Sequence, residues 1–370
     1  MNAVRMFAVT VFLAAVMNSA RAAEPVVLKG HTKAVTALAW AADGKTVATA
    51  GDDRTILMWD AETGRQTGSL ATIAREGYGG PVVAFTPDLK VVAVNYWGEI
   101  TIRNVADGKT LKKIDPILDR GQAAAFRPDV FAMAFSPDGK RLATGGSIAA
   151  VGGRHGLPGG IVIVWDSETG KIIHRSDKLS TAASSVAWST DGKRYAAGTN
   201  GAGGELPEAG EVLVWDAEKG KVLHSFKVKP EVDYGEWASA GDVAFASDSK
   251  RVAAPVTAGS RGAPAGLIIE EKETGGAVRV WDLTTGKSTQ PMKGLKASVG
   301  RLVFSPDGKR LVTAGSDKVV RVWDAEAGKE LAALHCPDQV NIVAFSPDGK
   351  SLAGGSHDGS VRIWAVPAGK

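Results

Sequence analysis

Residues 304 to 324 read FSPDGKRLVTAGSDKVVRVWD, which leads from Phe304 through an Asp-Gly-Lys turn to Trp323 and Asp324. A short apolar run precedes the aromatic residue, and two runs rich in Val follow the turn. Apolar runs of four to seven residues that are bounded by Gly, Asp and Pro are typical of β-strands. The stretch therefore predicts strands joined by tight turns.

The same pattern occurs seven times along the chain. An aromatic residue is followed five residues later by a lysine; the seven aromatic residues are Trp40, Phe85, Phe135, Trp188, Phe245, Phe304 and Phe345. A tryptophan then follows in six of the units, whereas the second unit has Asn104 at this position. A turn glycine and a further strand complete each unit. Self-similarity of this kind indicates a repeat architecture with four strands per unit.

This pattern resembles the WD-repeat family of β-propellers, and the resemblance covers almost all of residues 24 to 370. It implies an all-β fold, a seven-bladed propeller built from four-stranded antiparallel blades. In the first unit it also implies a hydrogen-bonded set that includes His31, Asp53 and Trp59. The other residues to which it gives structural roles are Trp165, Trp215, Trp281, Asp317, Trp323, Asp358 and Trp364.

Closure of the ring is predicted from the two ends of the repeat region. The seventh unit stops at Gly369 and Lys370, just after its third strand and turn. Residues 25 to 28, Pro-Val-Val-Leu, precede the first unit and have the composition of a strand. We predict that they pair with residues 360 to 364, because closure removes an exposed sheet edge that otherwise invites aggregation.

Residues 1 to 22 lie outside the repeats and resemble a secretory signal peptide. Arg5 is followed by an uncharged, largely apolar stretch from Met6 to Met17, and then by an Ala-Arg-Ala site that ends at Ala22. The stretch is shorter than the roughly 20 residues that span a bilayer. We expect a signal peptide at 1–22, a single propeller domain at 23–370 and an exported protein, periplasmic or extracellular. An uncleaved anchor is the alternative.

Charge and cysteine content narrow the classes of partner. The chain has 44 Lys and Arg and 40 Asp and Glu; without Arg5 and Arg21 the net charge is 42 minus 40, or +2. The sequence has no basic cluster with interleaved aromatic residues, which argues against nucleic acid as a partner. Cys336 is the single cysteine, so an internal disulfide is excluded, and we expect it to be a part-buried apolar side chain. No cofactor or metal is predicted.

Extra residues concentrate in three consecutive units. The aromatic residue lies 19 residues before the Trp position in units one, two, six and seven, but 30, 27 and 36 residues before it in units three, four and five. This surplus falls between the second and third strands, and other long segments join successive units. Antiparallel geometry brings both kinds of segment to one end of the ring. Variable loops on a rigid scaffold often carry function, so we expect a binding face over blades 3 to 5.

Aromatic and charged residues in these segments are the candidate partner-binding residues, because exposed Tyr and Trp are favoured binding anchors. We expect the aromatic ones to lie in loops and the charged ones nearby; the candidates are Tyr78, Tyr96, Trp97, Arg120, Arg154, His155, Tyr234, Trp237, Arg261 and Glu271. The alternative is that these glycine-rich loops are flexible spacers whose aromatic side chains pack back on neighbouring strands.

Two classes of function remain open. The favoured one is an exported, non-catalytic interaction scaffold that binds a protein, or a glycan, through the loops of blades 3 to 5. The alternative is an exported propeller enzyme that resembles lactonase-type hydrolases. Such catalysis needs convergent carboxylates or histidines in the channel. The six histidines are scattered, and Asp242 is an isolated candidate carboxylate near an inner strand. No catalytic residue is therefore predicted, and no stable membrane span is expected after signal cleavage.

Overall fold

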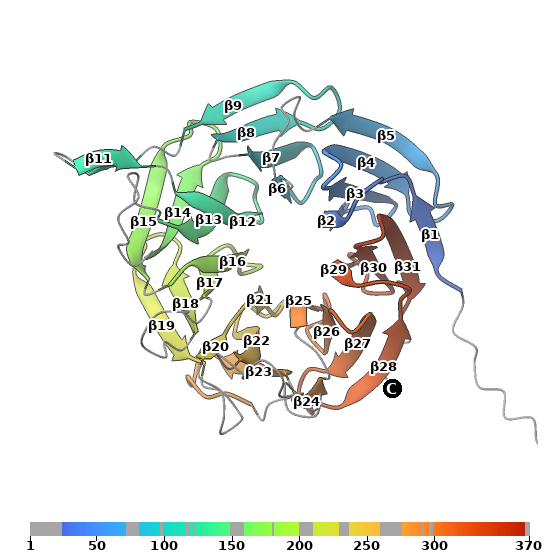
Figure 1. Cartoon of the computed structure of the whole chain (residues 1–370). Helices are drawn as coiled ribbons and strands as arrows, with labels where there is room; N and C mark the ends of the chain where they lie inside the picture. Colours follow the sequence, from blue (N-terminus) through green and yellow to red (C-terminus); the bar gives the residue numbers. More distant parts are fainter. Residues whose placement is uncertain are drawn as a thin grey trace, which may run out of the picture.

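The computed structural model describes residues 24–71, 81–96, 99–115, 118–120, 123–126, 128–148, 159–179, 181–199, 210–228, 237–259, 276–289, 292–295 and 299–366. Seven antiparallel sheets are arranged radially around a central channel, in the order of the seven repeat units (Figure 1). This arrangement is the predicted seven-bladed propeller. We number the blades after their repeat units.

In each of the first four blades the strands follow one another from the channel to the rim. Blade 1 contains β2 (Val35–Trp40), β3 (Thr46–Gly51), β4 (Thr55–Asp60) and β5 (Gln66–Ala71); blade 2 contains β6 (Val82–Phe85), β7 (Val91–Tyr96), β8 (Glu99–Asn104) and β9 (Thr110–Ile114); blade 3 contains β12 (Asp129–Phe135), β13 (Arg141–Ser147), β14 (Gly160–Asp166) and β15 (Ile172–Leu179); blade 4 contains β16 (Ala183–Trp188), β17 (Arg194–Thr199), β18 (Glu211–Asp216) and β19 (Val222–Lys227).

The remaining blades follow the same plan with two variations, an interrupted inner strand in blade 5 and a strand from the start of the chain in blade 7. Blade 5 contains β20 (Trp237–Ser239), β21 (Ala244–Phe245), β22 (Arg251–Gly259), β23 (Gly276–Asp282) and β24 (Met292–Leu295); blade 6 contains β25 (Val299–Phe304), β26 (Arg310–Gly315), β27 (Val319–Asp324) and β28 (Glu330–His335); blade 7 contains β29 (Val340–Phe345), β30 (Ser351–Ser356), β31 (Ser360–Ala365) and β1 (Val26–Lys29).

The predicted closure of the ring is confirmed. β1 pairs with β31 in antiparallel register, with Val26 opposite Ile363 and Lys29 opposite Ser360. Leu28 is fully buried and belongs to an apolar cluster between blades 7 and 1. The strand before the first repeat therefore completes the last blade and contributes to the packing between these two blades.

The core is divided among the seven junctions between neighbouring blades. Each junction holds one cluster of buried apolar side chains. In six clusters the repeat tryptophan of one blade packs against the preceding blade; Trp59, for example, lies in the cluster that includes Val361. Blade 2 has Asn104 instead, and the buried residues of the junction between blades 1 and 2 are Ala37, Ala50, Ile56, Val92 and Val94.

The Asp-Gly-Lys turns are held by their own side chains. In blade 3, Asp138 Oδ1 accepts hydrogen bonds from Ser136 Oγ (2.6 Å) and from the Lys140 backbone N–H (3.1 Å). Gly139 has a φ of 71°, which favours glycine because it has no Cβ. The Ser136 hydrogen bond, partly offset by burial, holds the pKa of Asp138 below its usual range. The recurring motif is therefore a turn that stabilises itself through the ionised aspartate.

Blade 1 contains a continuous chain of polar contacts from its turn to its tryptophan. His31 Nδ1 lies 2.9 Å from Asp53 Oδ2, and His31 Nε2 lies 2.8 Å from Thr49 Oγ1. Trp59 Nε1 in turn donates to Thr49 Oγ1 at 2.8 Å. Asp317 and Asp358, which occupy the position of Asp53 in blades 6 and 7, instead form ion pairs with the arginines four residues later.

Blade 4 lacks the hydroxyl group that receives the indole N–H in blades 1, 3 and 6. Trp165 and Trp323 donate to Thr144 and Thr313, as Trp59 does to Thr49. In blade 4 the equivalent residue is Ala197, which pairs with Leu213. Trp215 is almost fully buried, and its Nε1 has no hydrogen-bond partner among the described residues. A buried donor without a partner costs free energy.

Replacing Ala197 by threonine is expected to make the protein more stable than replacing it by valine, by about 1 kcal/mol. The two side chains have similar volumes, so the comparison isolates the hydroxyl group. The free energies of unfolding of both variants can be measured by urea denaturation. Equal values would show that the Trp215 indole gains nothing from a hydroxyl group at this position.

Candidate functional site

One face of the ring collects the segments in which the repeat units differ. In blade 3 the cross-strand partners Asp129, Ser147, Gly160 and Leu179 lie at the same end of the sheet. Connections between second and third strands, and connections between blades, therefore leave from this end, which we call the upper face. The additional residues of units three to five fall between Ser147 and Gly160, between Thr199 and Glu211, and between Gly259 and Gly276.

Most of the predicted partner-binding residues lie outside the described part of the chain. These are Tyr78, Trp97, Arg154, His155, Tyr234, Arg261 and Glu271. The other three, Tyr96, Arg120 and Trp237, lie in three different strands, β7, β10 and β20, so the expectation that Tyr96 and Trp237 lie in loops was wrong.

The physical reason is that strands extend further than the repeat pattern suggests. β22 has nine residues, and its last three pair with β20, with Trp237 opposite Gly259. Tyr96 is the last residue of β7 and pairs with Glu99. The guanidinium of Arg54 lies 5.9 Å from the centre of the Tyr96 ring, which links blade 1 to blade 2.

A small hairpin between blades 2 and 3 was not predicted. β10 (Leu118–Arg120) and β11 (Ala123–Phe126) pair with each other, with Leu118 opposite Phe126. In Figure 1 the label of β11 lies outside the ring of blades. The long interval between Asn104 and Phe135 was the only sequence signal of an added element here.

The central channel is a cavity that is lined by described residues from all seven blades. Its volume is about 770 Å³, and residues from the inner segment of every blade line it. The residue three positions before the repeat aromatic lines the channel in each blade; these residues are Ala37, Val82, Ala132, Ser185, Asp242, Arg301 and Ile342. Five of these seven positions are uncharged. The charged pair comes from the neighbouring blades 5 and 6.

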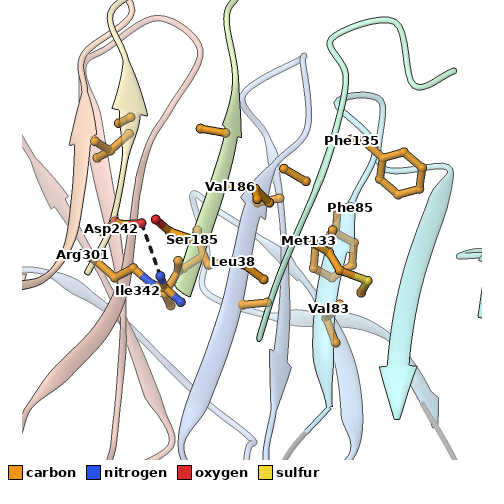
Figure 2. A pocket seen from close by; sticks show the side chains of 18 of the residues that line it. Leu38, Val83, Phe85, Met133, Phe135, Ser185, Val186, Asp242, Arg301 and Ile342 are labelled. Atoms are coloured by element: carbon orange, nitrogen blue, oxygen red, sulfur yellow. Dashed lines mark hydrogen bonds and ion pairs between the residues drawn. The ribbon is translucent and has the colours of Figure 1, made fainter. Parts of the chain in front are cut away.

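Asp242 and Arg301 form an ion pair across the junction of these blades (Figure 2). Arg301 Nη1 lies 3.4 Å from Asp242 Oδ1, and the Leu302 backbone N–H donates to Asp242 Oδ2 at 2.8 Å. Burial raises the pKa of Asp242, and the Arg301 charge and backbone hydrogen bonds oppose this effect only in part. The carboxylate therefore joins two blades.

The local chain explains why an aspartate occurs at this point of the inner segment. Residues 240 to 243 separate β20 from β21, so this stretch is not part of the regular ladder with β22. Pro255 lies in β22 opposite the gap and has no backbone N–H to contribute. The sequence points to Asp242 as a carboxylate near an inner strand, whereas Arg301 becomes evident only when the seven units are aligned at this position.

The described residues offer little for metal or thiol chemistry. Within the described ranges, His, Cys, Asp and Glu side chains form no group of three or more that could hold a metal ion. Cys336 is buried between blades 6 and 7, and burial raises its thiol pKa to about 11. In the described part of the chain no helix is long and apolar enough to cross a membrane.

Comparison with known proteins identifies the repeats directly. Residues 24–60, 124–166, 286–324 and 328–365 match the family described as WD domain, G-beta repeat. These stretches include the tryptophans of blades 1, 3, 6 and 7. The chain is 32% identical over 75 residues to "Nuclear distribution protein PAC1" of Coccidioides posadasii, a match that covers 20% of this chain and 16% of that protein.

A longer match is found with "WD repeat-containing protein SL1-17" of Schistosoma mansoni. It is 28% identical over 173 residues, which is 46% of this chain and 50% of that protein. The chain thus spans half or less of the length of these relatives. Four stretches of the chain thus match WD40 repeats, and its seven blades form a closed β-propeller.

Proposed function

We propose that the protein is an exported, non-catalytic scaffold that binds a protein partner through the upper face of blades 3 to 5. WD40 propellers are typically protein-interaction scaffolds and are generally non-catalytic. The observation that carries the proposal is the position of the additional residues, which join upper-face strand ends in three consecutive blades. Export is supported by the signal-like sequence of residues 1 to 22.

The strand ends that bear these segments are firmly connected at the junction of blades 4 and 5. The Ala240 backbone N–H donates to the Thr199 carbonyl oxygen at 3.0 Å. Ser184 Oγ lies 3.2 Å from the carbonyl oxygens of both Gly198 and Gly241. These contacts fix the positions of the strand ends from which the connecting segments leave, and preorganisation of this kind limits the entropy lost on binding.

Replacing residues 260–275 with a short Gly-Ser linker is expected to abolish capture of the partner, because it removes the largest addition to the upper face. Partners can be captured on the immobilised mature protein and identified by mass spectrometry. The matched control replaces residues 72–80, which join blades 1 and 2 outside the proposed surface, and this variant should retain the partner. Retention by the first variant, with both melting temperatures unchanged, would contradict the proposal.

A further inference from the structure

The wall of the central channel carries an ion pair on one side and apolar side chains on another, and its lining also includes Thr36, Asp52 and Thr190. Asp242, Arg301 and Ser185 lie together on one side, whereas Phe85, Met133 and Val83 lie apart from them on the other (Figure 2). The volume of about 770 Å³ falls within the range of roughly 300–1,000 Å³ that is usual for small-molecule sites. A mainly apolar cavity with a few polar groups on one side is the usual form of such a site.

Arg301 is the member of the ion pair that is available to a ligand. Its side chain is 35% exposed, whereas that of Asp242 is 11% exposed. Both oxygens of Asp242 already have partners, because Oδ2 accepts the Leu302 backbone N–H and Oδ1 pairs with Arg301. A guanidinium has five N–H donors, and the contact with Asp242 engages Nη1 alone at 3.4 Å. The geometry therefore favours an anion on Arg301 over a cation on Asp242.

The opposite wall offers apolar surface that is not fully covered. Phe131 lines the channel from blade 3 and is 47% exposed, which is unusual for a large aromatic side chain. Met133, two residues further along the same strand, also lines the channel. Covering such surface would stabilise a bound apolar group.

We propose that the channel binds a small molecule that joins a carboxylate to an apolar, preferably aromatic, group. The carboxylate pairs with the Arg301 guanidinium, whose planar N–H donors match its two oxygens. The apolar group packs against the side of the channel formed by Phe131 and Met133. Asp242 acts as a positioning residue that holds Arg301 toward this site. The proposal concerns a different surface from the partner-binding face and does not depend on it.

The proposal is tested with N-acetylphenylalanine and its primary amide, which have the same apolar group and differ in charge. Isothermal titration calorimetry of the mature protein should show binding of the acid, with the amide weaker by about tenfold or more. A longer peptide with the same free carboxyl terminus identifies the source of the carboxylate. Equal binding of this peptide would point to a chain end, and weaker binding to a free acid. The proposal is overturned if acid and amide bind equally or if neither binds.

Variants of the two walls separate ligand binding from stability. Arg301→Met should abolish binding of the acid, Arg301→Lys should retain part of it, and Phe131→Ala should weaken the acid and the amide alike. Because Arg301→Met leaves Asp242 without its partner, the double variant D242N/R301M serves as the control. It should recover the melting temperature without recovering binding. Binding by the double variant at the wild-type level would overturn the role of Arg301.

Discussion

Replacing Leu28 by alanine is expected to lower the free energy of unfolding by about 3 kcal/mol, as for other fully buried leucines. Leu28 has no exposed surface and packs between the last blade and the first. Val27, the preceding residue in β1, is 39% exposed because successive residues of a strand point to opposite faces. Val27→Ala is therefore the matched control, and its effect should stay below about 1 kcal/mol.

The pair of variants tests whether β1 closes the ring. Both leave the backbone pairing of β1 with β31 intact, so a difference between them reports the packing of Leu28 alone. Deleting residues 24 to 29 removes this packing together with the strand pairing, and the melting temperature should fall further than in Leu28→Ala. Urea and thermal unfolding measure these effects. Similar stabilities of the deletion variant and the wild type would refute closure by the first strand.

Asp53→Ala is the second substitution with a large expected effect, a loss of about 3 kcal/mol in the free energy of unfolding. The carboxylate accepts hydrogen bonds from the backbone N–H groups of Thr32 (2.8 Å) and Thr55 (3.0 Å) and from Thr55 Oγ1 (2.7 Å). It also holds the ring of His31, which connects to Trp59 through Thr49. Removing the carboxylate leaves several donors without a partner.

The neighbouring Asp52 provides a control whose pKa is shifted in the opposite direction. Burial raises the pKa of Asp52 from its usual value of 3.8. For Asp53, burial also acts upward, but hydrogen bonds from Thr55 and Thr32 and the charge of His31 outweigh it and lower the pKa. Ionisation therefore favours the folded state at Asp53 and disfavours it at Asp52. Asp52→Asn should leave stability at pH 7 unchanged or increase it.

The pH dependence follows from these two shifts. The stability that Asp53 contributes is present above pH 3.8 and is lost as the pH falls through its lowered folded-state pKa. The difference between wild type and Asp53→Ala should therefore shrink in acid. Protonation of Asp52 favours the folded state, so its contribution is present below pH 3.8 and is lost as the pH rises through its raised folded-state pKa. Urea denaturation at pH 7 and below pH 3.8 measures both effects, and a difference for Asp53→Ala that is the same at both pH values would contradict this account.

Much of the fold could be predicted because each repeat carries the same local signals. The aromatic residue, the Asp-Gly-Lys turn and the tryptophan each act over a few residues, so their spacing predicts strands, turns and the number of blades. The apolar residues 25 to 28 were recognised as a strand in the same way. The hairpin of β10 and β11 lies between two repeat units, so the regular spacing of the repeat residues does not predict it.

The channel site was harder to predict because it depends on contacts between repeats. Asp242 and Arg301 are 59 residues apart and meet because neighbouring inner segments are adjacent in the ring. Asp242 stands out within its own unit as a carboxylate near an inner strand, but Arg301 does not, and neither unit alone indicates that the two residues meet. The assignment of Tyr96 and Trp237 to loops was wrong for a related reason, since backbone pairing extended β7 and β20 to these residues without any change in composition.

The absence of a repeat tryptophan from blade 2 has a consequence for the ring as a whole. The interface between blades 1 and 2 buries small and aliphatic side chains where the other interfaces bury an indole as well. Local opening of a protein occurs most readily where the fewest buried apolar contacts hold its elements together, and here that is the junction of blades 1 and 2. The junction of blades 1 and 2 lies one blade away from the pairing of β1 with β31, which joins the two ends of the chain. A partner that binds across blades 1 and 2 would therefore stabilise the entire ring against transient separation of these blades.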